Sequence, residues 1–133
     1  MAVAEQAIVA RLEAVSGVTD LASTRIYPVK LPQSATLEAI TYQRVSTRRG
    51  HLMGTDDGIA YTRVQVTSWA ETYSEAKALA EAVRVALQRF SGTVGGLEVL
   101  DVMAEAELDL YGDDESDSGV HAVAQDFTVI HRE

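Results

Sequence analysis

Residues 61 to 90 carry two hydrophobic periodicities in succession. Between Tyr61 and Trp69, odd-numbered and even-numbered positions fall on opposite faces, which is the period-two pattern of a half-buried strand. After a short turn, apolar residues recur at spacings of three and four, which predicts a helix with one apolar stripe. That stripe consists of Ala76, Leu79, Ala80, Val83, Ala86, Leu87 and Phe90. The segment therefore predicts a strand followed by a helix that packs on a core.

Polar residues mark both ends of this predicted helix. Thr72 and Glu75 have the spacing of a capping box, in which the threonine hydroxyl accepts from an amide of the first turn. Ser91 and Gly92 follow the last apolar position, and glycine readily adopts the left-handed conformation that ends many helices. We therefore expect the helix to run from about residue 73 to Phe90.

The remaining periodicities predict four more regular elements and one irregular connection. We expect a first helix over residues 3–15, ended by Ser16-Gly17, and an irregular connection over 18–37 that contains two prolines. Strands are predicted over residues 39–46, 98–108 and 120–131. In the strand over 98–108, the even-numbered residues from Glu98 to Leu108 should share one face. The opposite face should then carry Asp101, Glu105, Glu107 and Asp109.

The order of elements is helix, strand, strand, helix, strand, strand. This order predicts an α+β domain with an antiparallel sheet of about four strands and two helices packed mainly on one face. Two polar segments connect the strands, at about residues 47–58 and 109–119. The first is longer than common hairpin loops, and the second has too little apolar surface to offset the entropy of ordering. We expect both to be mobile loops in the isolated chain.

Composition fits a single domain over residues 1–133. The 133 residues are 47% hydrophobic and include no cysteine, which excludes disulfides, thiolate nucleophiles and cysteine metal clusters. We expect a soluble chain without an export leader or a membrane partner, because no apolar run approaches the ~20 residues that span a bilayer.

The formal net charge of the chain is -9 at pH 7. Sequence-specific binding of nucleic acid is disfavoured, because contacts with phosphates require lysine and arginine side chains. A negatively charged surface can still let DNA slide past without adhesion.

The candidate chemical groups do not form a known catalytic motif. The histidines are His51, His121 and His131, which lack the spacing of a helix-borne zinc pair, so we expect them to be surface or edge residues. No Gly-x-Ser-x-Gly sequence is present to position a serine nucleophile. We therefore expect neither enzymatic activity nor a cofactor.

Acidic residues cluster in the second connecting segment. Hard cations bind where several carboxylates lie close together, but an EF-hand that began at Asp113 would need glycine at Ser118 and glutamate at Ala124. We therefore interpret the cluster as a solvated acidic loop without a metal. The cluster consists of Asp113, Asp114, Glu115 and Asp117.

Positive charge concentrates around the first connecting segment of an otherwise acidic chain. The residues are Arg44, Arg48, Arg49 and His51. Two interpretations stay open for them: a solvated hairpin tip, or a contact with a partner.

Four segments, in order and at matching spacings, resemble a known family. They are residues 25–28 (RIYP), 40–46 (ITYQRVS), 63–66 (RVQV) followed by Trp69-Ala70, and 73–80 (YSEAKALA). Together they resemble the tail-completion proteins of long-tailed bacteriophages and prophages, over about residues 5–92. That family is similar in fold to the tail-terminator proteins of siphophages.

The resemblance implies a structural role. It implies a small α+β subunit of a ring, expected to be a hexamer, that caps the tail tube and joins it to the head connector. The protein would belong to the tail or neck of the virion, would assemble in the cytoplasm of the host bacterium, and would let DNA pass through the channel of the ring. The resemblance implies no catalysis, no cofactor and no sequence-specific contact with DNA.

A ring requires complementary surfaces on neighbouring subunits. We predict that Arg48 and Arg49 contact carboxylates of an adjoining subunit or of the tail tube, with the acidic cluster as one candidate partner. We also predict that the acidic cluster borders the channel and repels DNA. The alternative is a monomeric cytoplasmic binding module that holds a peptide or small ligand on the less covered sheet face, near Tyr42, Tyr61 and Trp69.

Overall fold

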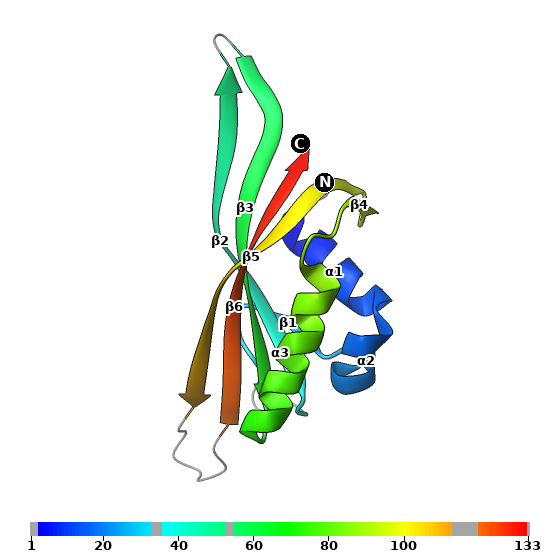
Figure 1. The fold of residues 1–133 in the computed structure, drawn as a ribbon, viewed down its shortest axis with the longest axis vertical. Coiled ribbons are helices and arrows are strands. Elements are labelled where there is room, and N and C mark those ends of the chain that lie inside the picture. The colour runs from blue at the N-terminus through cyan, green and yellow to red at the C-terminus, as the bar shows by residue number, and fades with distance from the viewer. Residues whose placement is uncertain (1–2, 33–35, 53–54, 113–119, 133) are drawn as a thin grey trace.

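The computed structural model describes residues 3–32, 36–52, 55–112 and 120–132, with side chains placed except at 50–52, 55–57 and 111–112. Three helices and six strands form this part of the chain (Figure 1). The helices are α1 (Ala4–Ala14), α2 (Ser16–Ala22) and α3 (Tyr73–Leu87). The strands are β1 (Ile26–Pro28), β2 (Ala39–Leu52), β3 (Thr55–Ala70), β4 (Gly92–Val94), β5 (Leu97–Gly112) and β6 (Val120–Arg132).

One sheet contains all six strands, in the order β1-β2-β3-β6-β5-β4. Strands β1 and β2 are parallel, and every other neighbouring pair is antiparallel. The helices lie on one side of the sheet (Figure 1), so the α+β class and the one-sided packing are confirmed. The predicted four strands and two helices are too few, because α2, β1 and β4 were not predicted.

The segment 18–37 is more regular than expected. Residues 18–22 belong to α2, whose Val18 and Ala22 are fully buried, and β1 pairs with the start of β2. The chain breaks from helical geometry only at Val15, between α1 and α2. A helix of seven residues and a strand of three are too short to show a hydrophobic period, which is why sequence periodicity missed them.

Strands β2 and β3 extend much further than the sequence predicted. The expected loop over residues 47–58 is wrong, because β2 continues to Leu52 and β3 already begins at Thr55. Pairing between β3 and β6 ends at Ile59 and Arg132. Among the described residues, the last part of β2 and the first part of β3 therefore pair only with each other. We call this two-stranded part, residues 50–52 and 55–58, the β2–β3 arm. Figure 1 shows it projecting beyond the rest of the domain.

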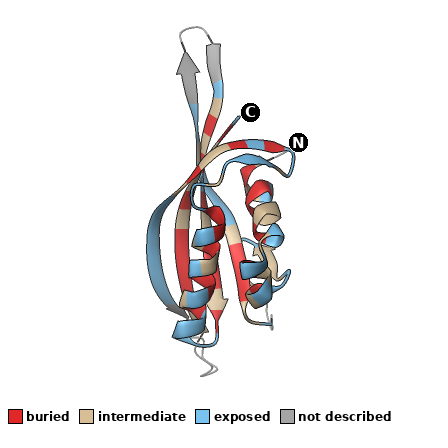
Figure 2. Cartoon of the chain, turned by 45° about the vertical axis from the view of Figure 1, so that its right-hand side comes forward, coloured by how far each residue is buried: buried red, intermediate tan, exposed pale blue. Residues whose placement is uncertain are grey.

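Alternation along β3 and β6 builds the core as expected. On β3, Val64 and Val66 are fully buried beneath the helices, while Arg63, next to Val64, is exposed on the opposite face. Phe127 of β6 pairs with Val64 and is also fully buried. These side chains belong to one core cluster with apolar residues of α3. Figure 2 shows the buried positions along the strands and on the helices in red. The buried stripe comprises Ala76, Leu79, Ala80, Val83, Ala86 and Leu87.

Strand β5 does not alternate as predicted, because its register with β6 shifts twice. The shifts lie between Val99 and Asp101 and between Ala104 and Ala106. Each such bulge adds one residue and exchanges the two faces of the strand that follows. Glu107 and Asp109, which pair with the helix-facing Gln125 and Val123, therefore face the helices. The predicted core face therefore holds between the two shifts, at Val102 and Ala104, and is wrong on either side of them.

The start of α3 is predicted well and its end is not. The amide of Glu75 donates to the Thr72 hydroxyl at 3.2 Å, and the Thr72 hydroxyl donates to the Glu75 carboxylate at 2.8 Å, so the capping box is confirmed. The helix ends at Leu87, and Arg89 rather than Gly92 adopts the left-handed conformation, with φ of 62°. Gly92 instead begins β4.

Candidate functional site

The predicted basic residues lie on β2, near one edge of the sheet. The short strand β1 covers only the start of β2, so these residues lie past the end of that pairing. Arg44 pairs with Val64 and Arg49 with Ala60, so both arginines lie on the face that carries the helices. Arg48 lies on the opposite face, where its guanidinium stacks 4.4 Å from the ring centroid of Tyr61. The strand therefore divides the predicted cluster between two faces. The backbone of His51 belongs to β2, and its side chain lies outside the described part of the chain.

Arg44 connects β2 to the first helix. Its Nη2 lies 2.8 Å and its Nε 3.0 Å from the same carboxylate oxygen, Oε1 of Glu5 in α1. Both side chains remain partly exposed, so solvent screens this pair. The contact therefore orients β2 relative to α1 and contributes little to the free energy of folding.

A cavity of about 630 Å³ lies between these elements and the last residues of β6. Arg44 and Arg49 line one wall, and Leu97, Glu98 and Arg132 line another. Arg132 donates to Glu98 at 3.1 Å, so charge of both signs borders the cavity.

Two of the three histidines have described side chains. His131 is 6% exposed and its Nε2 lies 2.9 Å from the Thr62 hydroxyl, so the expectation of a surface or edge position is wrong for this residue. Its position on the helix-facing side of β6 explains the burial. His121 is partly exposed and meets the ring of Tyr73 edge-on, with centroids 6.1 Å apart.

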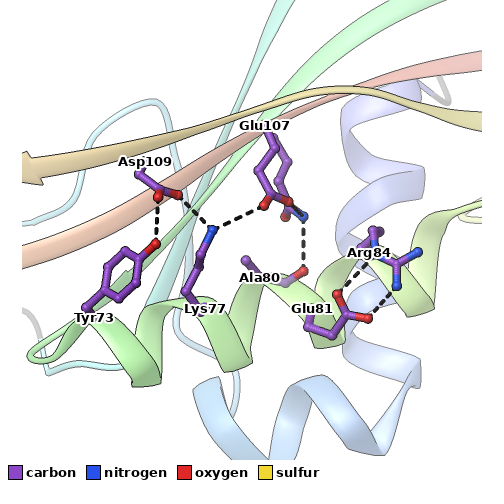
Figure 3. Close-up of polar contacts among 8 residues, drawn as sticks. Tyr73, Lys77, Ala80, Glu81, Arg84, Glu107 and Asp109 are labelled. Carbon is purple, nitrogen blue, oxygen red and sulfur yellow. Dashed lines mark hydrogen bonds and ion pairs between the residues drawn. The ribbon is translucent and has the colours of Figure 1, made fainter.

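The carboxylates of β5 bind the start of α3 (Figure 3). Lys77 Nζ lies 2.9 Å from Asp109 Oδ1 and 3.4 Å from Glu107 Oε2. The hydroxyl of Tyr73 donates to Asp109 Oδ2 at 2.7 Å. Hydrogen bonds from Tyr73 and then Lys77 lower the pKa of Asp109, and the bond with Asp109 raises the pKa of Lys77. Sequence reasoning missed this network because the bulge between Ala104 and Ala106 places both carboxylates on the same side as Val102, which faces the helices.

A buried amide extends the same network towards the core. Gln125 is 3% exposed, and its Nε2 donates to the Ala80 carbonyl at 3.1 Å and to Glu107 Oε1 at 3.0 Å. Figure 3 shows Arg84 paired with Glu81 further along α3. These contacts position β5 against α3 and offer no nucleophile paired with a base.

The face of the sheet opposite the helices carries an exposed apolar pair. Leu108 is 61% exposed and Leu110 is 42% exposed on β5. Trp69 lies on the same face and donates through Nε1 to the Thr41 hydroxyl at 2.9 Å. Tyr42 faces the helices and packs against the core, so its predicted place on this face is wrong.

The acidic cluster, Asp113, Asp114, Glu115 and Asp117, lies outside the described residues. Strand β5 extends to Gly112, so only the later part of the predicted loop over 109–119 is left between the strands. Elsewhere in the described ranges, no three histidine or acidic side chains are grouped as metal ligands would be. None of the described helices is long and apolar enough to cross a membrane.

Comparison with known families decides the relationship. The profile of a family described as "Tail completion protein gp17" matches residues 6–132. The chain belongs to this family. The resemblance to phage tail-completion proteins, read from four segments within residues 25–80, is thereby confirmed and extends through β5 and β6. No curated protein matches the sequence.

A solved structure shares the fold of this tail-completion protein. A chain from a structure titled "Virion of native gene transfer agent (GTA) particle" superposes with a TM-score of 0.78 at 13% sequence identity. The match covers 98% of this chain and 95% of that chain. At this identity the likeness establishes the fold alone.

Proposed function

We propose that this protein is a non-catalytic ring subunit that caps the tail tube and joins it to the head connector. Membership of the tail-completion family over residues 6–132 carries the proposal. The shared fold with a chain of a virion particle supports a place in the tail or neck. We infer a homo-oligomeric ring, with six subunits as the expected number, assembled in the cytoplasm of the host bacterium.

The long axis of the domain suits a subunit that must contact two different assemblies. The β2–β3 arm projects at one end, and the end of β5 and the start of β6 lie at the other (Figure 1). In a ring whose axis follows the strands, one end would meet the tail tube and the other the connector. Arg48 lies next to the arm, where it can reach carboxylates of the tail tube or of an adjoining subunit.

The channel of such a ring must let DNA pass. The net charge of -9 suits this task, because like charge suppresses adhesion of the phosphate backbone. We propose that the residues between β5 and β6, which include Asp113 and Asp114, border the channel. Electron cryomicroscopy of a capped tube tests this placement, and density for these residues on the outer wall would refute it.

The experiment for the function itself uses purified chain and tail tubes made from the major tail protein of the same genome. We expect the chain to bind one end of each tube and to stop further elongation, as seen by negative-stain electron microscopy. Tubes that keep elongating, with bare ends at saturating concentrations of the chain, would contradict the proposal.

A second candidate function is a monomeric module that holds a peptide on the open sheet face. The exposure of Leu108 and Leu110 beside Trp69 favours contact of that face with an apolar partner. Light scattering at several concentrations separates a permanent monomer from a self-associating subunit. Because a ring subunit can also be monomeric before it meets the tail, the capping experiment decides between the two functions.

A further inference from the structure

The short outer strands β1 and β4 cover only part of the length of β2 and β5. Strand β1 pairs with β2 only as far as Tyr42, and β4 pairs with β5 only as far as Val99. The backbone amide of Arg89 donates a hydrogen bond to the Val102 carbonyl at 2.7 Å. Within the described residues, no strand pairs with the outer edge of β2 from residue 43 or with that of β5 from residue 103. Each edge leaves about ten residues of backbone without a strand partner.

The two open edges carry opposite charge. The β2 edge presents Arg44, Arg48 and Arg49, and the β5 edge presents Glu105, Glu107 and Asp109. These side chains also make contacts within the chain, among them Arg44 with Glu5, Arg48 with the Tyr61 ring, Glu105 with Thr128, and Glu107 and Asp109 with Lys77. All six residues are exposed, so these contacts leave the charges accessible to a neighbour.

Charged edge strands commonly serve to prevent edge-to-edge aggregation. Charge of either sign would serve that purpose, and the same sign on both edges would serve it best. Here one edge is basic and the other acidic, so β2 repels β2 and β5 repels β5 of another copy. Only the pairing of β2 with β5 brings opposite charges together, and that contact is heterologous, as a ring requires.

We propose that β2 of one subunit pairs with β5 of the next, so that the sheets join into one closed barrel around the channel. This inference rests on the proposed ring function and names the interface that builds the ring. The occupant of each edge is a second copy of this chain, held by backbone hydrogen bonds and by arginine–carboxylate pairs across the two strands.

The directions of the strands permit this pairing. Neighbouring strands from β2 through β3 and β6 to β5 alternate in direction, so β5 runs opposite to β2. A rotation about an axis along the strands keeps these directions, and β2 then meets β5 of the next copy in antiparallel fashion. No chain reversal or domain swap is needed.

The relative positions of the two open edges along the strand direction also fit a closed barrel. Through the ladder, Thr47 lies level with Thr62, Val129 and Val102. Among the registers that keep helix-facing residues together, two set Thr47 opposite Glu107 or Asp109 of the next copy, with a stagger of about four or six residue levels, roughly 13 or 20 Å. Four strands span about 19 Å, so the strands would tilt by roughly 35° or 45°, which is the range found in closed barrels.

In either register, Arg49 lies directly or diagonally across from Glu107 on the same face of the joined sheet. Cross-strand pairs of opposite charge stabilise a sheet, and like charges at these positions destabilise it. This difference allows a test by charge exchange. The first variant, Arg48→Glu with Arg49→Glu, makes both edges acidic. The second, Glu105→Arg with Glu107→Arg, makes both edges basic.

Capping of tail tubes and light scattering serve as the two readouts, with circular dichroism to confirm that each variant folds. We expect each variant alone to lose capping by about tenfold or more at a fixed concentration. An equal mixture of the two variants should restore capping, because acidic and basic edges then alternate around the ring. The chain with all four substitutions should also recover, since its charges are exchanged rather than lost.

Matched substitutions away from the open edges control for net charge. Lys30→Glu with Arg63→Glu, the latter on the central strand β3, changes the net charge as much as the first variant does, and it should cap tubes normally. If the wild type caps tubes and neither edge variant loses capping, the edge pairing is overturned while the proposed function stands. The same holds if the variants lose capping and the mixture does not restore it. A wild-type chain that neither self-associates nor caps tubes overturns both.

Discussion

The hydroxyl of Tyr73 donates to the carboxylate of Asp109 across 2.7 Å, which joins the first turn of α3 to the outer half of β5. Lys77, one turn further along the helix, donates to the other oxygen of the same carboxylate at 2.9 Å. Beyond Val102, the described side chains of β5 include no buried apolar residue. Polar contacts therefore hold this edge of the sheet against the helix.

This arrangement predicts a pH dependence. Asp109 has a lowered pKa in the folded chain, because Tyr73 and Lys77 bind its ionised form. The contacts therefore contribute to stability above the ordinary aspartate pKa of about 3.9 and lose that contribution as pH falls through the folded value. We expect the free energy of unfolding to fall more steeply below about pH 4 in the wild type than in Asp109→Asn.

Urea unfolding at several pH values between about 2 and 6 measures this difference. Asp20→Asn, on α2 and away from the network, is the matched control and should keep the wild-type slope. Parallel curves for wild type and Asp109→Asn would show that the contacts do not persist in solution.

The centre of the sheet should be the most sensitive part of the core. Phe127 is fully buried where β6 pairs with β3, so its truncation to alanine leaves a cavity. We expect Phe127→Ala to lower the free energy of unfolding by about 3–5 kcal/mol. Val85→Ala, on the exposed side of α3, should change it by no more than about 0.5 kcal/mol. Denaturant titrations of both variants check the contrast, and similar losses would contradict the assigned core.

The cap of α3 offers a conservative test of local structure. Thr72→Ala removes the hydroxyl that accepts from the Glu75 amide and should cost about 1 kcal/mol of stability. Thr72→Ser keeps the hydroxyl and should stay close to the wild type. Thermal unfolding of the three proteins distinguishes them, and equal losses in both variants would indicate that the methyl group rather than the cap matters.

The residue that ends α3 provides a prediction about backbone strain. Arg89 has φ of 62°, a conformation that costs residues with a side chain about 1–2 kcal/mol relative to glycine. Both Arg89→Gly and Arg89→Ala remove the ion pair with Asp101, so their difference isolates the backbone. We expect the glycine variant to be more stable than the alanine variant by about 1 kcal/mol in urea unfolding. The reverse order would mean that the helix ends differently in solution.

Sequence periodicity predicted those elements that have a core face to bury. Strand β3 and helix α3 alternate apolar and polar residues because one side of each packs against the other. In the sequence of the β2–β3 arm, glycine and charged residues replace the alternation, so the strands were mistaken for a loop. The same reasoning explains why β5 was expected to end before Asp109.

The candidate surfaces were predicted in part. Arg44, Arg48 and Arg49 do lie together on β2, but a strand sends neighbouring side chains to opposite faces, which a loop need not do. Glu107 and Asp109 were assigned to the wrong face, because a bulge has no reliable signature in a single sequence. The pairing of Lys77 with these residues depends on that bulge and was therefore missed.

The β2–β3 arm has a thermodynamic consequence for the whole domain. Among the described residues its backbone hydrogen bonds join only two strands, and a two-stranded ribbon is marginally stable in water. Amide protons of residues 55–58 should therefore exchange with deuterium through local opening, far faster than those of Val64 and Val66 in the core. The arm can consequently be reshaped against a partner at little cost to the stability of the domain that carries it.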